Sequence, residues 1–322
     1  MDVTWREMTQ EPPQQAPKII VLGGINMDLV TFSARFPQPG ETVVGTRFLT
    51  YAGGKGANQA VAAARMGARS AMVGRVGGDI FGPQLLDGLA AAGVDISGVG
   101  VNPEENSGIA VVGVDETAQN CITQVLGAND TCGPPEAAAV RRLLPGASAL
   151  LLQLEVSLEL SLEAARDAKA QGVAVMLDPG PVRPVGDQLL SICDVITPNE
   201  TEAQALVGFP VTGPESAARA ASVLLDRGVV TAVVKLGVQG AYFAGRDSRG
   251  MVPPFDVDAV DSVAAGDAFN GALAVSLAQG KDLEEAVTVA SAAGALAVTR
   301  TGAQDSMPER QQVEDLMRSQ RP

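Results

Sequence analysis

The chain has 322 residues, of which 46% are hydrophobic and 19% charged, a composition typical of a globular protein with a substantial core. The sequence contains no histidine, which excludes Ser-His-Asp chemistry and imidazole zinc sites, and its three cysteines lack Cys-x-x-Cys spacing, so that no disulfide framework or thiolate metal site is indicated. A formal net charge of −14 disfavours nucleic acid and anionic membranes as partners.

The N-terminal segment, residues 1–17, is rich in proline and glutamine and has no continuous apolar run. This pattern predicts a disordered tail and does not resemble a secretory signal. Farther along the chain, no apolar run has the roughly eighteen residues that a membrane span requires. We therefore expect a cytoplasmic protein without a membrane-spanning segment.

From residue 18 onward, short apolar runs alternate with helical patterns. Strands are expected at 18–22, 71–73, 149–152, 173–177, 195–196 and 229–234. Helices are expected at 57–66, 83–92, 134–144, 160–170, 200–207 and 214–227. From residue 266 onward the pattern is helical, through 272–275 and 283–298, and ends with an amphipathic segment at 308–319. The alternation predicts an α/β fold with a mostly parallel central sheet and helices on both faces. This domain would comprise residues 18–28, 52–108 and 127–322.

Two stretches, 29–51 and 109–126, interrupt this alternation. The first contains the β-prone run 42–48, and in the second valine-rich runs flank a polar turn, as in antiparallel hairpins. Because both follow strand ends, they could form a small β lid over the mouth of the main domain or a dimer surface. Ordinary edge hairpins are equally consistent with the pattern.

The segment 260–272 leads from a turn of small residues directly into a helix. Exposed amides of Ala264, Ala265 and Gly266 at a helix N-terminus would form an anion site. A carboxylate beside the bound anion, Asp267, could then take a proton from a hydroxyl that attacks a phosphate. Asp267 could equally serve only as a helix-capping residue, and this segment alone does not separate the two interpretations.

A second glycine-rich turn, residues 52–60, opens the helix expected at 57–66 and carries Lys55 and Asn58. It is not a Walker A loop, because glycine and not Ser or Thr follows the lysine. Likewise, the glycines after the first strand lack the Gly-x-Gly-x-x-Gly spacing of a dinucleotide-binding dehydrogenase. The two helix starts together favour phosphate chemistry at Asp267 over simple capping.

In these and five further segments, the chain resembles the ribokinase (PfkB-type) family of carbohydrate kinases over nearly its whole length. The segments are Gly-Ile-Asn-Met-Asp (24–28), Pro-Gly-Glu-Thr (39–42), Gly-Gly-Lys-Gly-Ala-Asn-Gln-Ala (53–60), Gln-Leu-Glu (153–155), Thr-Pro-Asn-Glu-Thr-Glu (197–202), Asp-Ser-Val-Ala-Ala-Gly-Asp (261–267) and Ala-Val-Thr-Arg-Thr-Gly-Ala-Gln (297–304). Any one of them is weak evidence, whereas their order and spacing together are highly specific.

The resemblance implies a site that binds the hydroxyl groups of a sugar. Its residues would be Asn26, Asp28, Gly53, Gly54, Lys55, Asn58, Glu155 and Asp267. Amide, carboxylate and ammonium groups suit a pentose, whose hydroxyls offer donors and acceptors at fixed spacing. Without the resemblance, the same residues would be interpreted as turn formers, a helix cap and surface charges.

The resemblance also implies an ATP site formed by Asn199, Glu202, Lys235, Gly237, Gly240, Ala265, Gly266 and Ser291. Glu202 would reach the Mg²⁺ that accompanies ATP through water, since Mg²⁺ retains several of its waters. Helix capping is the alternative for Asn199 and Glu202. Lys235 stands where members of the family often have Thr, so its role differs from the family pattern.

Members of the family use a monovalent cation, usually K⁺. The matching positions for its ligands are Asp261, Val263, Ala297, Arg300, Gly302 and Ser306. Val263 replaces a common Thr, but the expected ligand is its carbonyl oxygen, so the site should be preserved.

The activity implied by the resemblance is ATP-dependent phosphorylation of the primary 5-hydroxyl of a free pentose. D-Ribose is the first candidate substrate. Asp267 would be the general base and the amides of residues 264–266 the anion hole. The alternatives are a kinase for a nucleoside, deoxyribose or another sugar, and a regulator that binds sugar or nucleotide without turnover. The regulator would be expected to have a damaged Asp267 segment, which is intact here. A homodimer formed through the β lid is the expected assembly.

Overall fold

The computed structural model describes residues 15–117 and 119–320, so most of the tail predicted at 1–17 lies outside the described residues. Its centre is a nine-stranded sheet in the order β13-β12-β11-β10-β9-β8-β1-β4-β5. The strands are β1 (Lys18–Leu22), β4 (Arg69–Gly77), β5 (Asp95–Asn102), β8 (Ala149–Leu152), β9 (Ala174–Leu177), β10 (Val195–Ile196), β11 (Thr231–Lys235), β12 (Ala241–Ala244) and β13 (Arg249–Val252). All pairs are parallel except β11–β12 and β12–β13.

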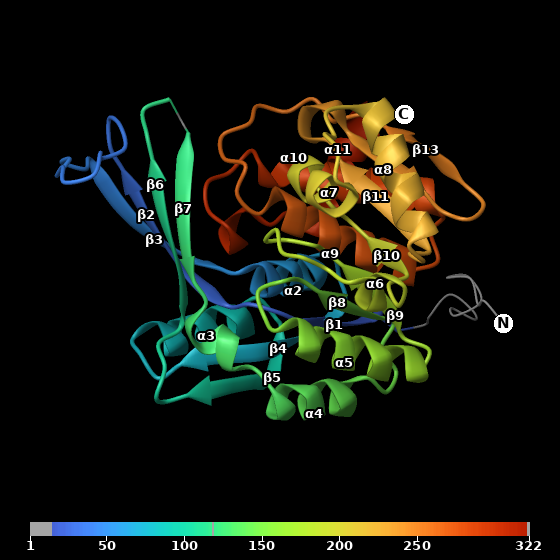
Figure 1. Ribbon diagram of the computed structural model, residues 1–322, viewed down its shortest axis with the longest axis horizontal. Coiled ribbons are helices and arrows are strands. Elements are labelled where there is room, and N and C mark those ends of the chain that lie inside the picture. Colours follow the sequence, from blue (N-terminus) through green and yellow to red (C-terminus); the bar gives the residue numbers. More distant parts are fainter. Residues whose placement is uncertain (1–14, 118, 321–322) are drawn as a thin grey trace.

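Helices cover both faces of this sheet, as the sequence predicts (Figure 1). One face packs against α2 (Lys55–Arg65), α3 (Phe81–Ala91), α9 (Ala265–Ala278), α10 (Leu283–Ala297) and α11 (Arg310–Gln320). The other packs against α4 (Pro134–Leu143), α5 (Leu158–Ala170), α6 (Asp187–Leu190), α7 (Glu200–Val207) and α8 (Pro214–Asp226). Within β1, Ile19 and Val21 belong to the first core, and Ile20 and Leu22 to the second. The continuous apolar run of β1 reflects burial on both faces.

A separate four-stranded sheet stands to one side of the main body (Figure 1). It has the order β3-β2-β6-β7 and consists of β2 (Asn26–Phe32), β3 (Arg47–Gly53), β6 (Gly108–Val114) and β7 (Asn120–Val125). The outer pairs are antiparallel, as expected for hairpins, and the central pair β2–β6 is parallel. The small sheet therefore joins two hairpins that are distant in sequence.

The strand bounds differ from the predicted lid in two places. Strand β2 begins at Asn26, so Asn26 and Asp28 lie in the small sheet and not in the main domain. The run 42–48 was predicted as strand, but only its last two residues, from Arg47, are in β3. The valines of that run do not enter a core, since Val44 is 87% exposed, and β-prone residues without burial need not pair.

The sequence pattern also missed three strands, β5, β12 and β13. They lie toward the two edges of the central sheet. In β5 and β13, glycine and charged residues interrupt the apolar ones, and β12, Ala-Tyr-Phe-Ala, is a short apolar run that was not predicted as a strand. Among the described residues, no helix combines the length and the apolar character needed to cross a membrane.

Candidate active site

Most of the polar segments singled out in the sequence follow the carboxyl ends of neighbouring parallel strands. Gly24 to Asn26 follow β1, Glu155 follows β8, Asn199 follows β10, and Lys235 ends β11. In open α/β sheets, ligands bind at this edge. The fold therefore collects side chains from remote parts of the sequence in one region.

Helix α2 begins at this edge, and the position directly before it must be glycine. Gly54 has a φ of 90°, and a Cβ there would lie 2.7 Å from the carbonyl oxygen of Gly24. The amide of Lys55, at the start of the helix, donates a hydrogen bond of 2.7 Å to Oε2 of Glu155. A buried carboxylate from the β8 end thus occupies the N-terminus of α2.

Glu155 connects this helix start to the small sheet. Its Oε1 accepts hydrogen bonds from Asn26 Nδ2 at 3.1 Å and from Gln124 Nε2, in β7, at 2.5 Å. Asn129 in turn donates to Oδ1 of Asn26 at 2.8 Å. Neither Gln124 nor Asn129 was predicted from the sequence, and the only local signal is the polar side chain of Gln124 in the β-prone second hairpin.

Asp28 lies against the end of β3 on the same side. A Cβ at Gly53 would approach Oδ2 of Asp28 to 2.3 Å, so glycine makes room for this carboxylate. Burial, with the nearby charges of Glu155 and Asp267, raises the pKa of Asp28 to about 7. Burial likewise raises the pKa of Glu155, against the opposing effect of Lys55. The structure therefore brings together the predicted residues Asn26, Asp28, Gly53, Lys55 and Glu155.

Asp267 lies in the first turn of α9 and is 4% exposed. Its Oδ2 accepts a hydrogen bond from Asn58 Nδ2 at 2.9 Å, and its Oδ1 accepts one from Gln59 Nε2 at 3.0 Å. Burial raises the pKa of Asp267 to about 6, against the lowering effect of Lys55 and the two amide donors. Such a carboxylate is ionised near neutral pH and is a stronger base than an exposed aspartate.

The turn before α9 has an unusual backbone. Ala264 has a φ of 60° and is the only non-glycine residue with positive φ in the described part of the chain. Among the described residues, none accepts a hydrogen bond from the backbone amides of Ala264 or Gly266. Free amides in a left-handed turn that leads into a helix form a concave anion site.

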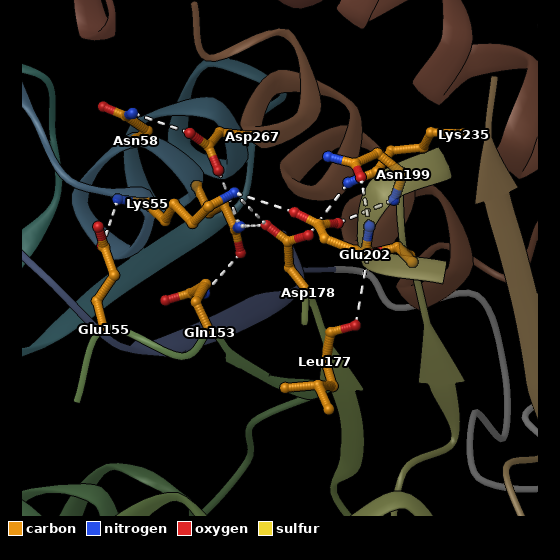
Figure 2. A network of polar contacts seen from close by, with 12 residues as sticks. Lys55, Asn58, Gln153, Glu155, Leu177, Asp178, Asn199, Glu202, Lys235 and Asp267 are labelled. Atoms are coloured by element: carbon orange, nitrogen blue, oxygen red, sulfur yellow. Dashed lines mark hydrogen bonds and ion pairs between the residues drawn. The ribbon is translucent and has the colours of Figure 1, made fainter. Parts of the chain in front are cut away.

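Asp178, directly after β9, connects the start of α2 to the end of β11 and was not predicted from the sequence. Its Oδ2 accepts from Lys55 Nζ at 3.2 Å and from Gln59 Nε2 at 3.0 Å, and its Oδ1 accepts from Lys235 Nζ at 3.1 Å (Figure 2). Although burial alone would raise the pKa of Asp178, the two ammonium groups hold it below its usual range. The available signal was a carboxylate at the end of a predicted strand.

Three residues expected at the nucleotide, Asn199, Glu202 and Lys235, lie on the side of Asp178 away from Glu155 (Figure 2). Asn199 and Glu202 form a reciprocal cap of α7, with Asn199 Oδ1 accepting from the Glu202 amide at 2.8 Å and Glu202 Oε2 accepting from the Asn199 amide at 2.9 Å. The backbone of Asn199 pairs with that of Lys235. Asn199 and Glu202 therefore cap α7 and also lie beside the site.

Of the other residues expected at the nucleotide, Gly237 and Gly240 lie in the segment after β11, and Ser291 lies in α10. Gly237 and Gly240 bound a turn with positive φ, and a Cβ at Gly240 would lie 2.1 Å from the carbonyl oxygen of Val252. The hydroxyl of Ser291, in α10, is buried and has no hydrogen-bond partner among the described residues. No described side-chain hydrogen bond links Ser291 to Asn199, Glu202 or Lys235.

Asp261 connects the two segments expected around a monovalent cation. Its Oδ1 accepts from the amide of Val263 at 3.0 Å, and its Oδ2 accepts from the amide of Gly302 at 3.1 Å. Within the described residues, no hydrogen bond is donated to the carbonyl oxygens of Val263, Arg300 or Gly302, whereas the carbonyl of Ala297 accepts from the amide of Arg300. Ser306 is buried, and its hydroxyl donates to the carbonyl of Ala303.

Comparisons with known proteins agree with this arrangement. A family model described as pfkB family carbohydrate kinase matches residues 16–310. Ribokinase of Haemophilus influenzae is 38% identical over 299 residues, covering 93% of this chain and 98% of the relative. Deoxyribokinase of Salmonella typhi is 36% identical over 300 residues, covering 93% and 98%. The structure of Arabidopsis thaliana ribokinase complexed with ribose and ATP has a TM-score of 0.86 and 34% identity, covering 94% of this chain and 99% of that one.

Proposed function

Because the chain belongs to the pfkB family of carbohydrate kinases, we propose that it transfers the γ-phosphoryl group of ATP to the 5-hydroxyl of D-ribose. The observation that carries the proposal is the position of Asp267. This buried carboxylate lies beside the free amides of Ala264 and Gly266, and Asn58 joins it to the helix start that contacts Glu155.

In this mechanism, Asp267 accepts the proton of the primary hydroxyl as the hydroxyl oxygen attacks the γ-phosphorus in line. The new O–P bond forms while the bond from the γ-phosphorus to the bridging oxygen of ADP breaks. The amides of Asn58 and Gln59 hold both oxygens of Asp267 in a fixed orientation. Its pKa of about 6 keeps it ionised at neutral pH while it remains basic enough to take the proton.

The amide of Ala265, also expected in the anion hole, donates to the carbonyl of Ser262 at 3.5 Å. The negative charge of the transferring group is therefore stabilised by the free amides of Ala264 and Gly266. They are already oriented by the left-handed turn at Ala264, so little reorganisation is needed during the reaction. When bound, Mg²⁺ neutralises charge on the ATP phosphates. Glu202 fits a contact through water, because its Oε2 is engaged by the α7 cap while its Oε1, 3.9 Å from Lys55 Nζ, faces the site.

A monovalent cation, K⁺, would bind behind the anion loop at Asp261. The observation that supports this site is the group of carbonyl oxygens at Val263, Arg300 and Gly302 that accept no hydrogen bond from the described residues. With the Asp261 carboxylate, they form an all-oxygen set of the kind that alkali cations prefer. The cation would fix the loop that carries Ala264 to Gly266.

The small sheet would act as a lid and as the dimer surface of a cytoplasmic enzyme. By the strand register, three of its exposed apolar side chains, Phe48, Val111 and Val125, share one face of the sheet and are 41% to 59% exposed, whereas Ile122 lies on the other face with Gln124. Grouped exposed apolar residues are typical of a surface that a partner covers. Gln124 carries the lid function, since it reaches from this sheet to Glu155.

The test is ADP formation with a panel of acceptors in K⁺ and in Na⁺: D-ribose, 2-deoxyribose, D-fructose and adenosine. The expected result is the highest kcat/KM with D-ribose and faster turnover in K⁺. Phosphorylation of adenosine but not of ribose would overturn the proposal. Preference for 2-deoxyribose would assign the chain to the activity named for its Salmonella relative, and absence of turnover with bound ligands would indicate a regulator.

A further inference from the structure

The carboxylate of Asp178 has no role in the proposed mechanism, yet it has three partners in the site, Lys55, Gln59 and Lys235. It is 1% exposed and binds Lys55 through one oxygen and Lys235 through the other (Figure 2). Its Oδ2 also accepts from Gln59, whose same amide group binds Asp267. One carboxylate thus fixes two cations and the donor that orients the proposed base.

The two lysines lie close to the reacting groups. A Cβ at Gly266 would lie 3.3 Å from Nζ of Lys235, which places this ammonium beside the free amides at the start of α9. The Lys55 ammonium lies 3.9 Å from Glu202 Oε1, and its pKa is raised by Asp178, Asp267, Glu202 and Glu155 despite the opposing effect of burial. Both side chains are only partly exposed, 28% for Lys55 and 13% for Lys235.

Folding stability alone does not explain why Asp178, Lys55 and Lys235 are grouped together. Moving a charged side chain out of water costs several kcal/mol, and an ion pair seldom recovers more than that cost. Lysine side chains also lose much rotamer entropy when they are fixed. A shared buried carboxylate removes this freedom for both lysines before a ligand arrives, so that their positive charges are preorganised for an anion.

We infer that Asp178 is a positioning residue that holds Lys55 and Lys235 as a paired cationic cradle for the phosphates of ATP. Lys235, beside the α9 amides, contacts the β- and γ-phosphates. Lys55 contacts the γ-phosphoryl group as it approaches the sugar. This inference rests on the proposed function for the identity of the nucleotide and deepens it, because it gives Lys235 a role at a position where the family pattern often has Thr.

The first experiment measures binding of ATP, ADP and AMP without sugar, in the presence of Mg²⁺, to the wild type and to Lys235→Met. A lost charge-assisted contact is worth about 1.5–3 kcal/mol, or about 10–100-fold in affinity. The affinity for ATP and ADP should fall by that factor, while the affinity for AMP should change less than about threefold. Lys235→Arg, which keeps the charge, should recover part of the loss. An equal loss for all three nucleotides would overturn the inference.

The second experiment tests Asp178 itself. Asp178→Asn keeps the shape of the side chain but removes the charge that holds both lysines. It should therefore lower the affinity for ATP as Lys235→Met does. The double variant Asp178→Asn with Lys235→Met should lose much less than the product of the two single losses, because both changes remove one interaction. Losses that multiply in full would contradict a positioning role.

The matched control is Asp194→Asn. Asp194 is another buried aspartate, 6% exposed, whose carboxylate binds Lys169 at 2.7 Å and the amide of Val175. This variant should lower the melting temperature but leave the ratio of ATP to AMP affinity unchanged. A similar change in that ratio would show that any buried carboxylate has the effect, which would overturn the assignment to Asp178. If Asp178→Asn does not fold, the Lys235 variants decide the question alone.

These measurements are independent of the acceptor sugar. A wild type that shows the predicted dependence on phosphate number but phosphorylates no pentose would retain the inference and refute the proposed function. A wild type that phosphorylates ribose while Lys235→Met binds ATP normally would retain the function and refute the inference.

Discussion

The starts of helices α2 and α9 are chemically similar but differ in what occupies them. Both follow turns of small residues with a left-handed residue at the N-cap, Gly54 in one case and Ala264 in the other. At α2, the carboxylate of Glu155 already accepts from the first amide. At α9, none of the described residues accepts from the amides of Ala264 or Gly266.

This difference assigns different tasks to two similar anion sites. A helix N-terminus attracts negative charge, and a protein can satisfy it internally or leave it for a ligand. Glu155 satisfies α2 and is thereby fixed for contacts with Asn26, Gln124 and, in our proposal, a sugar. In our proposal, the α9 site binds the transferring phosphate. The predictions below test this division, beginning with the largest effect.

Replacement of the base should have the largest effect. In Asp267→Asn, the side chain can no longer accept a proton, so kcat should fall by about 10²–10⁴-fold while ATP still binds. The control is Asp282→Asn, because Asp282 is an exposed aspartate that only caps α10, through a 2.9 Å bond from the Glu285 amide. The control should retain near-normal turnover. If Asp267→Asn does so as well, Asp267 is only a cap.

Glu155→Gln tests the occupied helix start. One of its accepting oxygens becomes an amide donor, so the bonds with Lys55, Asn26 and Gln124 cannot all be kept. We expect KM for ribose to rise by about 10–100-fold, as for loss of a hydrogen bond to a charged group, with ATP binding unchanged. Glu163→Gln, at an exposed ion pair with Arg141, is the control. An equal rise in KM for ATP would refute separate tasks.

The pH dependence tests the state of Asp267. Because its pKa is raised to about 6 and the base must be ionised, kcat/KM should fall tenfold per unit as pH drops below about 6. Asn58→Ala removes a donor to the charged form and should move this limb to higher pH. Measurement of kcat/KM between pH 4.5 and 8 decides the matter. A limb near pH 4 in the wild type would contradict the burial of an ionising base.

The smallest effect is expected at the cation site. Asp261→Asn weakens the contact with K⁺ but leaves the base in place, so turnover should fall only severalfold and lose its difference between K⁺ and Na⁺. Asp258→Asn, an exposed aspartate three residues earlier, should keep the response. Loss of all turnover in Asp261→Asn would show that Asp261 supports the α9 turn itself through its bonds to Val263 and Gly302.

The parts of the site that could be predicted from sequence are those formed by residues adjacent in the chain. The turn before α9 and the turn before α2 each consist of adjacent small residues, and Asp267 and Lys55 lie in the first turns of the helices that follow. Continuous apolar runs likewise predicted the central strands β1, β8 and β10 with their observed bounds.

Asp178 could not be found in the same way. Its partners Lys55, Gln59 and Lys235 are 123, 119 and 57 residues distant in sequence, and only the order of strands in the sheet brings them together. The prediction of a strand at 42–48 was wrong for the opposite reason. Its β propensity is local, but the tertiary structure offers most of it no partner strand and no core.

The left-handed backbone at Ala264 has a consequence for engineering the protein. An L-residue in this conformation costs about 1–2 kcal/mol relative to the right-handed one, and glycine would remove most of that cost. A selection for thermal stability alone would therefore favour Ala264→Gly. Glycine would also free the turn to leave the geometry that presents the amides, so added heat resistance would come with slower turnover. At this one residue, the alanine methyl group exchanges folding stability for a rigid anion site.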